Sequence, residues 1–172
     1  GNTAMDSCRT AKRLGADVTL VYRRSEAEMP ARIEEVKHAK EEGIKFLTLH
    51  NPKEYLTDEN GAVKAAVLDV MQLGEPDQSG RRRPETTGET ITIECDQVIV
   101  AVGVSPNPLV PKSIEGLTLG RKNTIAVNDQ MQSSRKEIYA GGDIVRGGAT
   151  VILAMGDGRR AAMNMSKQLT EA

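Results

Sequence analysis

Apolar residues at the amino end of the chain recur at helical spacing and then give way to an apolar run. Over residues 2–14, Ala4, Cys8 and Ala11 share one face while the basic residues point elsewhere, which predicts a helix. A glycine directly after this segment can adopt the left-handed backbone conformation that commonly ends a helix. The β-branched and aromatic run at residues 18–22 predicts a buried strand. A helix followed by a strand is half of a βαβ unit.

The pattern then changes from helix and strand to hairpins. Residues 30–43 open on a proline and close on a glycine, which predicts a second helix, and residues 44–49 predict the next strand. An Asn-Gly pair at residues 60–61 is a strong two-residue turn signal before a strand at residues 63–73. Apolar and polar positions alternate at residues 91–93. We expect an antiparallel flap attached to a parallel sheet.

A second region follows a near-continuous apolar run at residues 97–102, which is typical of a strand covered on both faces. Three prolines between residues 106 and 111 form a linker-like stretch. Short strands are predicted at residues 125–127 and 137–140, and a closing helix at residues 150–169.

The predicted fold class is α/β: a Rossmann-like parallel sheet with an antiparallel β-hairpin flap in residues 1–103, and a second domain in residues 104–172. A Rossmann unit places its first strand between the strands at 18–22 and 97–102, and no segment here supplies it. We therefore expect a piece of a longer protein, whose unpaired strand edges lead to self-association or poor nucleotide affinity.

Composition and charge exclude several classes of partner. The formal net charge is −1, from 23 basic and 24 acidic residues, so no field of one sign exists to hold nucleic acid or an anionic membrane. No apolar run approaches the roughly 20 residues that span a bilayer, and the chain opens without a secretion signal. The prediction is a cytoplasmic protein.

The two cysteines predict structural thiols. Cys8 and Cys95 form neither a CxxC redox pair nor a four-ligand metal set, so we assign no metal site. Their separation also disfavours the disulfide-reductase branch of flavoproteins, which needs two close sulfurs beside the flavin.

The residues that open the first helix match part of a dinucleotide-binding turn. Gly1 and Ala4 fit the second and third small positions of a GxGxxA pattern, with Asn2 and Thr3 between them. The free amides of a helix start bind phosphates, helped by the helix dipole. The alternative is an ordinary helix start rich in small residues.

Arg23 and Arg24 stand just after the first strand, about 20 residues beyond that turn, where the second strand of a Rossmann unit reaches the adenosine ribose. An acidic residue there would favour NAD. Two arginines instead offer paired donors to a 2′-phosphate, which predicts NADPH. The alternative is a solvated basic pair at a strand end.

A third group lies at the end of the strand at residues 137–140. Gly142 and Asp143 follow it and precede the closing helix, an arrangement in which an aspartate accepts a hydrogen bond from the ribityl chain of FAD and a helix start faces the isoalloxazine carbonyl. The alternative is a plain Gly-Gly-Asp turn. Ala101, Val102 and Gly103 form a weaker candidate, a strand end where backbone packs against cofactor.

Taken in order, these motifs resemble the glutamate synthase small subunit family. Similar proteins are the flavin subunits of ferredoxin:NADP oxidoreductases and the amino-terminal part of dihydropyrimidine dehydrogenase. The motifs are NTAMD at 2–6, YRR at 22–24, EMPAR at 28–32, LGEPD at 73–77 with GRRRP at 80–84, AVG at 101–103 and AGGDIV at 140–145.

The resemblance implies an FAD domain interrupted by an NADPH domain, with iron–sulfur clusters in a preceding segment outside this chain. Residues 104–172 would then be the carboxyl-terminal part of the FAD domain. Ala149 and Thr150 would lie at the flavin edge, and Arg32 would add to the phosphate pocket. Hydride would pass from NADPH to FAD and electrons onward to the clusters, so no side chain here is assigned as general acid or base.

Several alternatives stay open. The parent protein is either a glutamate synthase small subunit, with a large subunit as partner, or the flavin subunit of a ferredoxin:NADP oxidoreductase. The isolated chain is either an inactive enzyme fragment or a nucleotide-binding module without redox turnover. The triple arginine at residues 81–83 predicts a solvated hairpin tip, with a subunit contact as the alternative.

Overall fold

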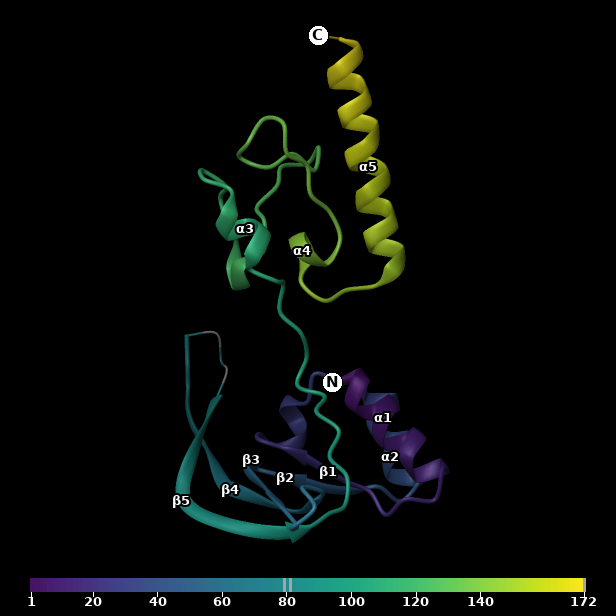
Figure 1. Ribbon diagram of the computed structural model, residues 1–172, viewed down its shortest axis with the longest axis vertical. Coiled ribbons are helices and arrows are strands. Elements are labelled where there is room, and N and C mark those ends of the chain that lie inside the picture. Colours follow the sequence, from purple (N-terminus) through teal and green to yellow (C-terminus); the bar gives the residue numbers. More distant parts are fainter. Residues whose placement is uncertain (79, 81, 172) are drawn as a thin grey trace. The chain divides into compact units, whose positions relative to one another are not determined.

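The chain divides into two units, Gly1–Val102 and Gly103–Ala172. The computed structural model describes residues 1–78, 80 and 82–171 (Figure 1). The assignment of residues 1–103 to NADPH and 104–172 to FAD stays a prediction, because this division follows contacts and not ligands. The predicted mixed α/β class is confirmed, since the first unit combines a parallel and an antiparallel sheet.

The first unit is organised around two parallel strands and two helices. Helix α1 (Asn2–Arg13) leads into β1 (Thr19–Tyr22), and α2 (Ile33–Glu41) leads into β2 (Lys45–Thr48), which pairs in parallel with β1. The predicted apolar face of α1 contributes Cys8 to the core and Ala4 beside it, but Ala11 is not a core residue and the buried Met5 was not predicted. The buried members of the core are Met5, Cys8, Leu20, Val36, Ala39 and Ile44.

The loop between β1 and α2 is more ordered than its polar sequence predicts. It contains a 3-10 turn, η1 (Glu26–Glu28), closed by a capping box in which Ser25 and Glu28 bond each other's backbone. Helix α2 begins at Ile33, three residues later than expected. The reason is that Arg32 keeps an extended backbone and donates its amide to the Asn2 side chain, 3.0 Å away.

An ionic cluster joins the two helices on their solvent side. Arg9 donates to Glu35 at 2.6 Å and to Glu42 at 2.9 and 3.0 Å, and Arg13 also donates to Glu42. The guanidinium of Arg13, and then that of Arg9, lowers the pKa of Glu42 to about 2. The cluster fixes α1 against the end of α2.

The flap is a three-stranded antiparallel sheet in the order β3 (His50–Thr57), β4 (Val63–Pro76) and β5 (Arg82–Glu94). The predicted Asn-Gly turn joins β3 to β4, and Leu68 of β4 is fully buried. At the β4–β5 tip, Arg82 donates to two carbonyls of β4, while Arg81 lies outside the described residues. The hairpins predicted from alternation are confirmed.

The predicted strand at residues 97–102 is not a strand. This segment has no regular secondary structure, and Ile99, Val100 and Val102 are 56%, 66% and 90% exposed. An apolar run becomes a strand only where a neighbour supplies backbone hydrogen bonds. Among the described strands, β1 pairs with β2 alone, and none pairs with residues 97–102. The prediction of burial on both faces was wrong for this chain.

The second unit is built from turns and one long helix. Its elements are α3 (Leu109–Ser113), the 3-10 turn η2 (Arg121–Asn123), α4 (Asp143–Arg146) and α5 (Val151–Thr170). The strands predicted at residues 125–127 and 137–140 are reduced to isolated bridges. The proline stretch predicted as a linker enters α3, where Pro111 is buried. The closing helix is confirmed, with Thr150 as its N-cap.

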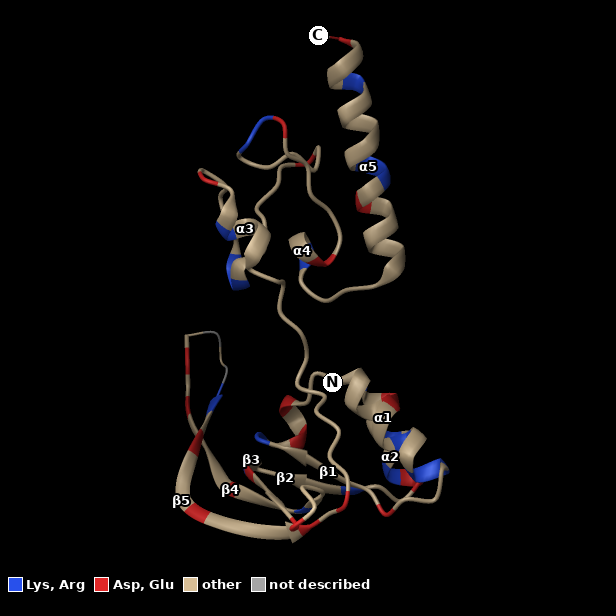
Figure 2. Ribbon diagram, in the orientation of Figure 1, with Lys and Arg blue, Asp and Glu red and all other residues tan. Residues whose placement is uncertain are grey.

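Charges of both signs are interspersed in each unit, as the balanced composition predicts (Figure 2). Within the described residues, no helix combines the length and the apolar character needed to cross a membrane.

We expect the Glu42→Gln variant to lose stability at neutral pH. The folded-state pKa of Glu42 lies below its ordinary 4.5. Its stabilising contribution is therefore complete above pH 4.5 and is lost as the pH falls toward 2. The free energies of unfolding in urea of the parent chain and of Glu42→Gln should differ most at pH 7 and become equal near pH 2. Glu41→Gln, whose contact to Lys37 is longer at 3.7 Å, is the control. A difference that persists unchanged at pH 2 would contradict the assignment.

Candidate functional site

The amino end of α1 presents unpaired backbone amides. Gly1 is the N-cap, and no side chain caps the helix. The Gly1 carbonyl accepts from the amides of Ala4 and Met5 at 3.0 and 3.2 Å. The amides of Asn2 and Thr3 have no intrahelical acceptor, as is usual at a helix start. Donors and dipole together suit an anion.

The loop before α2 lies against this helix start. Arg32 donates its amide to the Asn2 side chain, and a Cβ placed on Gly1 would lie 3.9 Å from Pro30. The structure thus brings the predicted residues Gly1, Asn2 and Arg32 together. Sequence reasoning left the loop position of Arg32 open, and this backbone bond defines it.

The two predicted arginines follow β1 on the same side of the unit. Helix α1 and β1 run in opposite directions, because only a short turn joins them, so the carboxyl end of β1 lies beside the amino end of α1. Ala4 near the start of α1 and Tyr22 at the end of β1 pack against the same core. Arg23 and Arg24 therefore follow the end of β1 that lies beside the helix start.

Neither the Arg23 nor the Arg24 side chain forms an ion pair with a carboxylate among the described residues. Arg23 is exposed, and Arg24 is half-buried with a fully buried Nε that has no hydrogen-bond partner. In the parts of the chain that the structure describes, no carboxylate pairs with Arg23, Arg24 or Arg32. A buried donor without a partner is uncommon and calls for an acceptor. The orphaned Nε of Arg24 marks the end of β1 as a candidate anion site.

The third predicted group, which includes Gly142 and Asp143, forms a tight turn against α5. Gly142 has φ +75° and ψ −148°, a conformation that favours glycine. A Cβ on Gly141 would lie 2.7 Å from that of Asp157, so only glycine fits there. The amide of Gly142 donates to Asp157 at 3.1 Å. This amide is therefore occupied, and the Gly142 carbonyl already accepts the amides of Val145 and Arg146 at 3.0 and 2.9 Å, so a ligand would meet Gly142 through its Cα.

The other predicted residues of this group gather on one loop. Asp143 accepts the amide of Ala149 at 3.2 Å, and Thr150 caps α5 by accepting from Leu153 at 3.4 Å. All three predicted residues are exposed. The Thr150 hydroxyl thus satisfies one of the first amides of α5.

Sequence reasoning missed an ion pair behind this loop. Arg146 at the end of α4 donates to both carboxylate oxygens of Asp157, each at 2.6 Å. The Arg146 guanidinium, with the Gly142 amide, lowers the pKa of Asp157 to about 2. The available signal was an aspartate between two glycines inside a helix of small and apolar residues.

The weaker candidate group does not form the expected strand end. The boundary between the two units falls within this group, between Val102 and Gly103. The segment that contains them and Ala101 has no regular structure. Their role in packing against a cofactor stays a prediction.

The cysteines show no redox pairing. Cys8 is buried, Cys95 is half-buried, and both are free thiols. Burial raises the pKa of each thiol, which lowers its thiolate fraction and its reactivity. No cluster of potential metal ligands occurs among the described residues.

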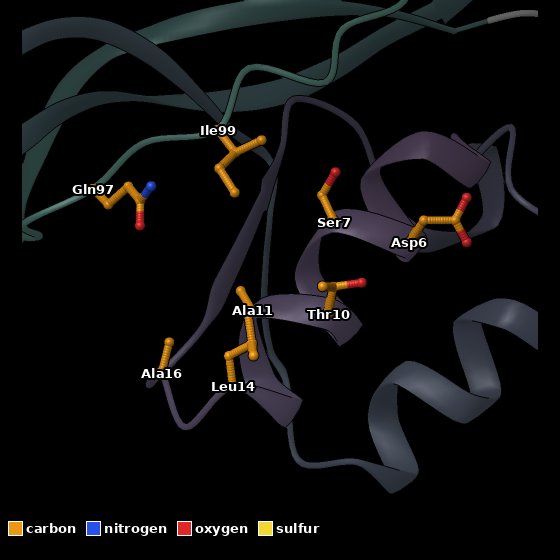
Figure 3. Close-up of a pocket in the computed structure, with 8 residues that line it drawn as sticks. All are labelled: Asp6, Ser7, Thr10, Ala11, Leu14, Ala16, Gln97 and Ile99. Carbon is orange, nitrogen blue, oxygen red and sulfur yellow. The ribbon is translucent and has the colours of Figure 1, made fainter.

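A pocket of about 480 Å³ lies apart from these groups (Figure 3). It separates α1 from the segment that follows the flap, and none of the predicted cofactor residues lines it. Its lining comes from α1, the turn that follows α1 and the segment after β5. The lining residues are Asp6, Ser7, Thr10, Ala11, Leu14, Ala16, Gln97 and Ile99.

Comparison with known proteins supports the resemblance seen in the motifs. The family model described as pyridine nucleotide-disulphide oxidoreductase matches residues 1–158. The chain is 41% identical over 175 residues to the NADP(+)-dependent formate dehydrogenase subunit beta of Moorella thermoacetica, covering 99% of this chain and 24% of that protein. It is 41% identical over 168 residues to the glutamate synthase [NADPH] small chain of Escherichia coli, covering 94% of this chain and 36% of that one. The chain thus spans about a quarter to a third of these relatives.

A solved structure shows the same fold. Thioredoxin reductase of Lactococcus lactis superposes with a TM-score of 0.81 at 22% identity, covering 100% of this chain and 51% of that one. At that identity the likeness concerns the fold alone.

We expect Gly141→Ala to destabilise the second unit by about 1–3 kcal/mol, because the added Cβ overlaps α5. Gly156→Ala is the control. Its Cβ would meet nothing within 4 Å, and it should raise stability by about 0.5–1 kcal/mol through helix propensity. Urea unfolding followed by circular dichroism measures both, and equal stability of Gly141→Ala and the parent would count against the close packing.

Proposed function

This chain belongs to the pyridine nucleotide-disulphide oxidoreductase family, and we propose that it is the NADPH-binding part of a flavin-dependent oxidoreductase like the glutamate synthase small subunit. The observation that carries the proposal is the unneutralised guanidinium pair at the end of β1, beside a helix start with free amides. A diphosphate and a 2′-phosphate need these two kinds of donor at this separation along a Rossmann unit.

The residues of the first unit would bind and orient the nucleotide. The amides at Asn2 and Thr3 face the pyrophosphate, Gly1 lets the backbone approach it, and the small side chain of Ala4 lets the helix pack close to the strand. Arg23 and Arg24 hold the 2′-phosphate, where the planar fork of arginine is better suited than lysine.

The second unit would contribute to the FAD site. Asp143 keeps one carboxylate oxygen on the Ala149 amide and directs the other toward the ribityl chain. Thr150 and the first turn of α5 lie at the flavin edge, where a helix dipole stabilises negative charge. NADPH and FAD supply the hydride chemistry when bound, and the chain supplies their placement.

Electron routing beyond the flavin would involve parts outside this chain. We propose that an amino-terminal segment with iron–sulfur clusters accepts the electrons in the cytoplasm, and that a glutamate synthase large subunit or a ferredoxin is the final partner. The relatives that carry the similarity are named as subunits, and the chain covers only part of each, which is consistent with missing partner regions.

We expect Arg23→Ala/Arg24→Ala to abolish the preference for NADPH over NADH. Each charge-assisted hydrogen bond contributes about 1.5–3 kcal/mol, so NADPH affinity should fall by at least tenfold while NADH affinity changes little. Isothermal calorimetry on the chain, with NADH as competitor, measures both. Arg121→Ala, an exposed arginine of η2, is the control. An unchanged preference in the double variant would remove the site.

The exposed run at residues 97–102 supports self-association as a property of the isolated chain. It borders the pocket beside α1, and β1 keeps one edge without a partner strand among the described residues. Such edges add strands from other molecules.

Val100→Lys should therefore reduce self-association, because a charge in an apolar run opposes strand addition. Sedimentation equilibrium over a range of concentrations should show oligomers of the parent chain and a shift to monomer in the variant. Gln130→Lys adds the same charge to an exposed loop of the second unit and should change nothing. A parent chain that is monomeric throughout would refute the proposal.

A further inference from the structure

Asp157 has the only buried charged side chain among the described residues, at 1% exposure. It lies two turns into α5, too far along to act as a helix cap. Its two oxygens accept three hydrogen bonds, two from Arg146 at 2.6 Å and one from the Gly142 amide at 3.1 Å. All three donors belong to the turn that precedes α5.

These bonds hold both ends of the short helix α4. Gly142 is its N-cap, and Arg146 is its last residue. Asp143 lies between them, and its carboxylate in turn accepts the Ala149 amide. One carboxylate on α5 therefore fixes the backbone on either side of Asp143 and, through it, the start of the loop that ends at Thr150.

Stability alone does not account for this arrangement. A buried ion pair loses much of its Coulombic gain to desolvation, and an apolar pair of similar volume often stabilises as well. A bidentate arginine and a backbone donor do provide fixed directions, which an apolar contact lacks. The close approach at Gly141 brings the turn near enough for these bonds to form.

We propose that Asp157 is a positioning residue for the flavin: it holds residues 142–150 in the shape that binds FAD before the ligand arrives. The inference rests on the proposed function, in which Asp143, Ala149 and Thr150 contact FAD. Asp157 itself is covered by Arg146 and the turn, so it acts through them and not by contact.

The test compares the whole chain with its Asp157→Asn, Arg146→Lys and Asp129→Asn variants. Asn keeps the size of Asp157 but loses the charge and one acceptor, Lys keeps the charge of Arg146 but loses the fork, and Asp129 is an exposed aspartate of the same unit. Added FAD is titrated by flavin fluorescence, the visible circular dichroism of bound flavin is recorded, and amide exchange at Gly142 and Ala149 is followed without FAD.

We expect Asp157→Asn to weaken FAD binding at least tenfold, to change the visible dichroism and to speed exchange at Gly142 and Ala149. Arg146→Lys should be intermediate, and Asp129→Asn should match the parent. If the parent binds FAD and Asp157→Asn binds it equally well, even with a lower melting temperature, the inference is overturned and the proposed function stands. If the parent does not bind FAD at saturating concentration, the proposed flavin contact fails first and the inference falls with it.

Discussion

Burial of one face each of α1 and α2 against the parallel β1–β2 pair fixes the helix start and the strand end on which the candidate dinucleotide site depends. Met5 and Ala39 are almost completely buried in this layer, so neither helix can rotate without exposing apolar surface. With α1 fixed, its amide end is fixed, and with β1 fixed, so is the point at which Arg23 leaves the strand. The ionic cluster of Arg9, Arg13 and Glu42 closes the opposite end of the same layer.

The two units reach order by different means. The first depends on strand ladders and a shared apolar core, which are cooperative over many residues. The second has few buried apolar side chains, among them Ile125 and Met131, and its predicted strands survive only as single bridges. There the Asp157 carboxylate and the glycine contacts take the place of a sheet in determining the backbone path. A unit held by a few directional bonds is more sensitive to the loss of any one of them.

Sequence reasoning succeeded where the information is local and failed where it depends on a distant partner. The spacing of Ala4, Cys8 and Ala11 predicts α1 because a helix satisfies its own hydrogen bonds. The run at residues 97–102 has equally strong strand character, yet a strand needs a neighbour, and none of the described strands provides one. Sequence reasoning missed the pair of Arg146 and Asp157 for the same reason, because only folding brings these two residues together. Arg32 was identified through family resemblance, but its place beside Asn2 depends on a backbone bond that spacing does not reveal.

The arginines of this chain differ in whether their side chains have partners. Arg9 and Arg13 face carboxylates across the helices, and Arg146 is paired inside the second unit. A chain with nearly equal numbers of acidic and basic residues has carboxylates enough to neutralise the rest. Among the described residues, Arg23 and Arg24 lack a carboxylate partner, as do other arginines such as Arg121. What distinguishes Arg24 is that its Nε is buried and without an acceptor. Buried donors are costly when unsatisfied, so the Nε of Arg24 calls for an acceptor, and the 2′-phosphate of the proposed ligand would supply one.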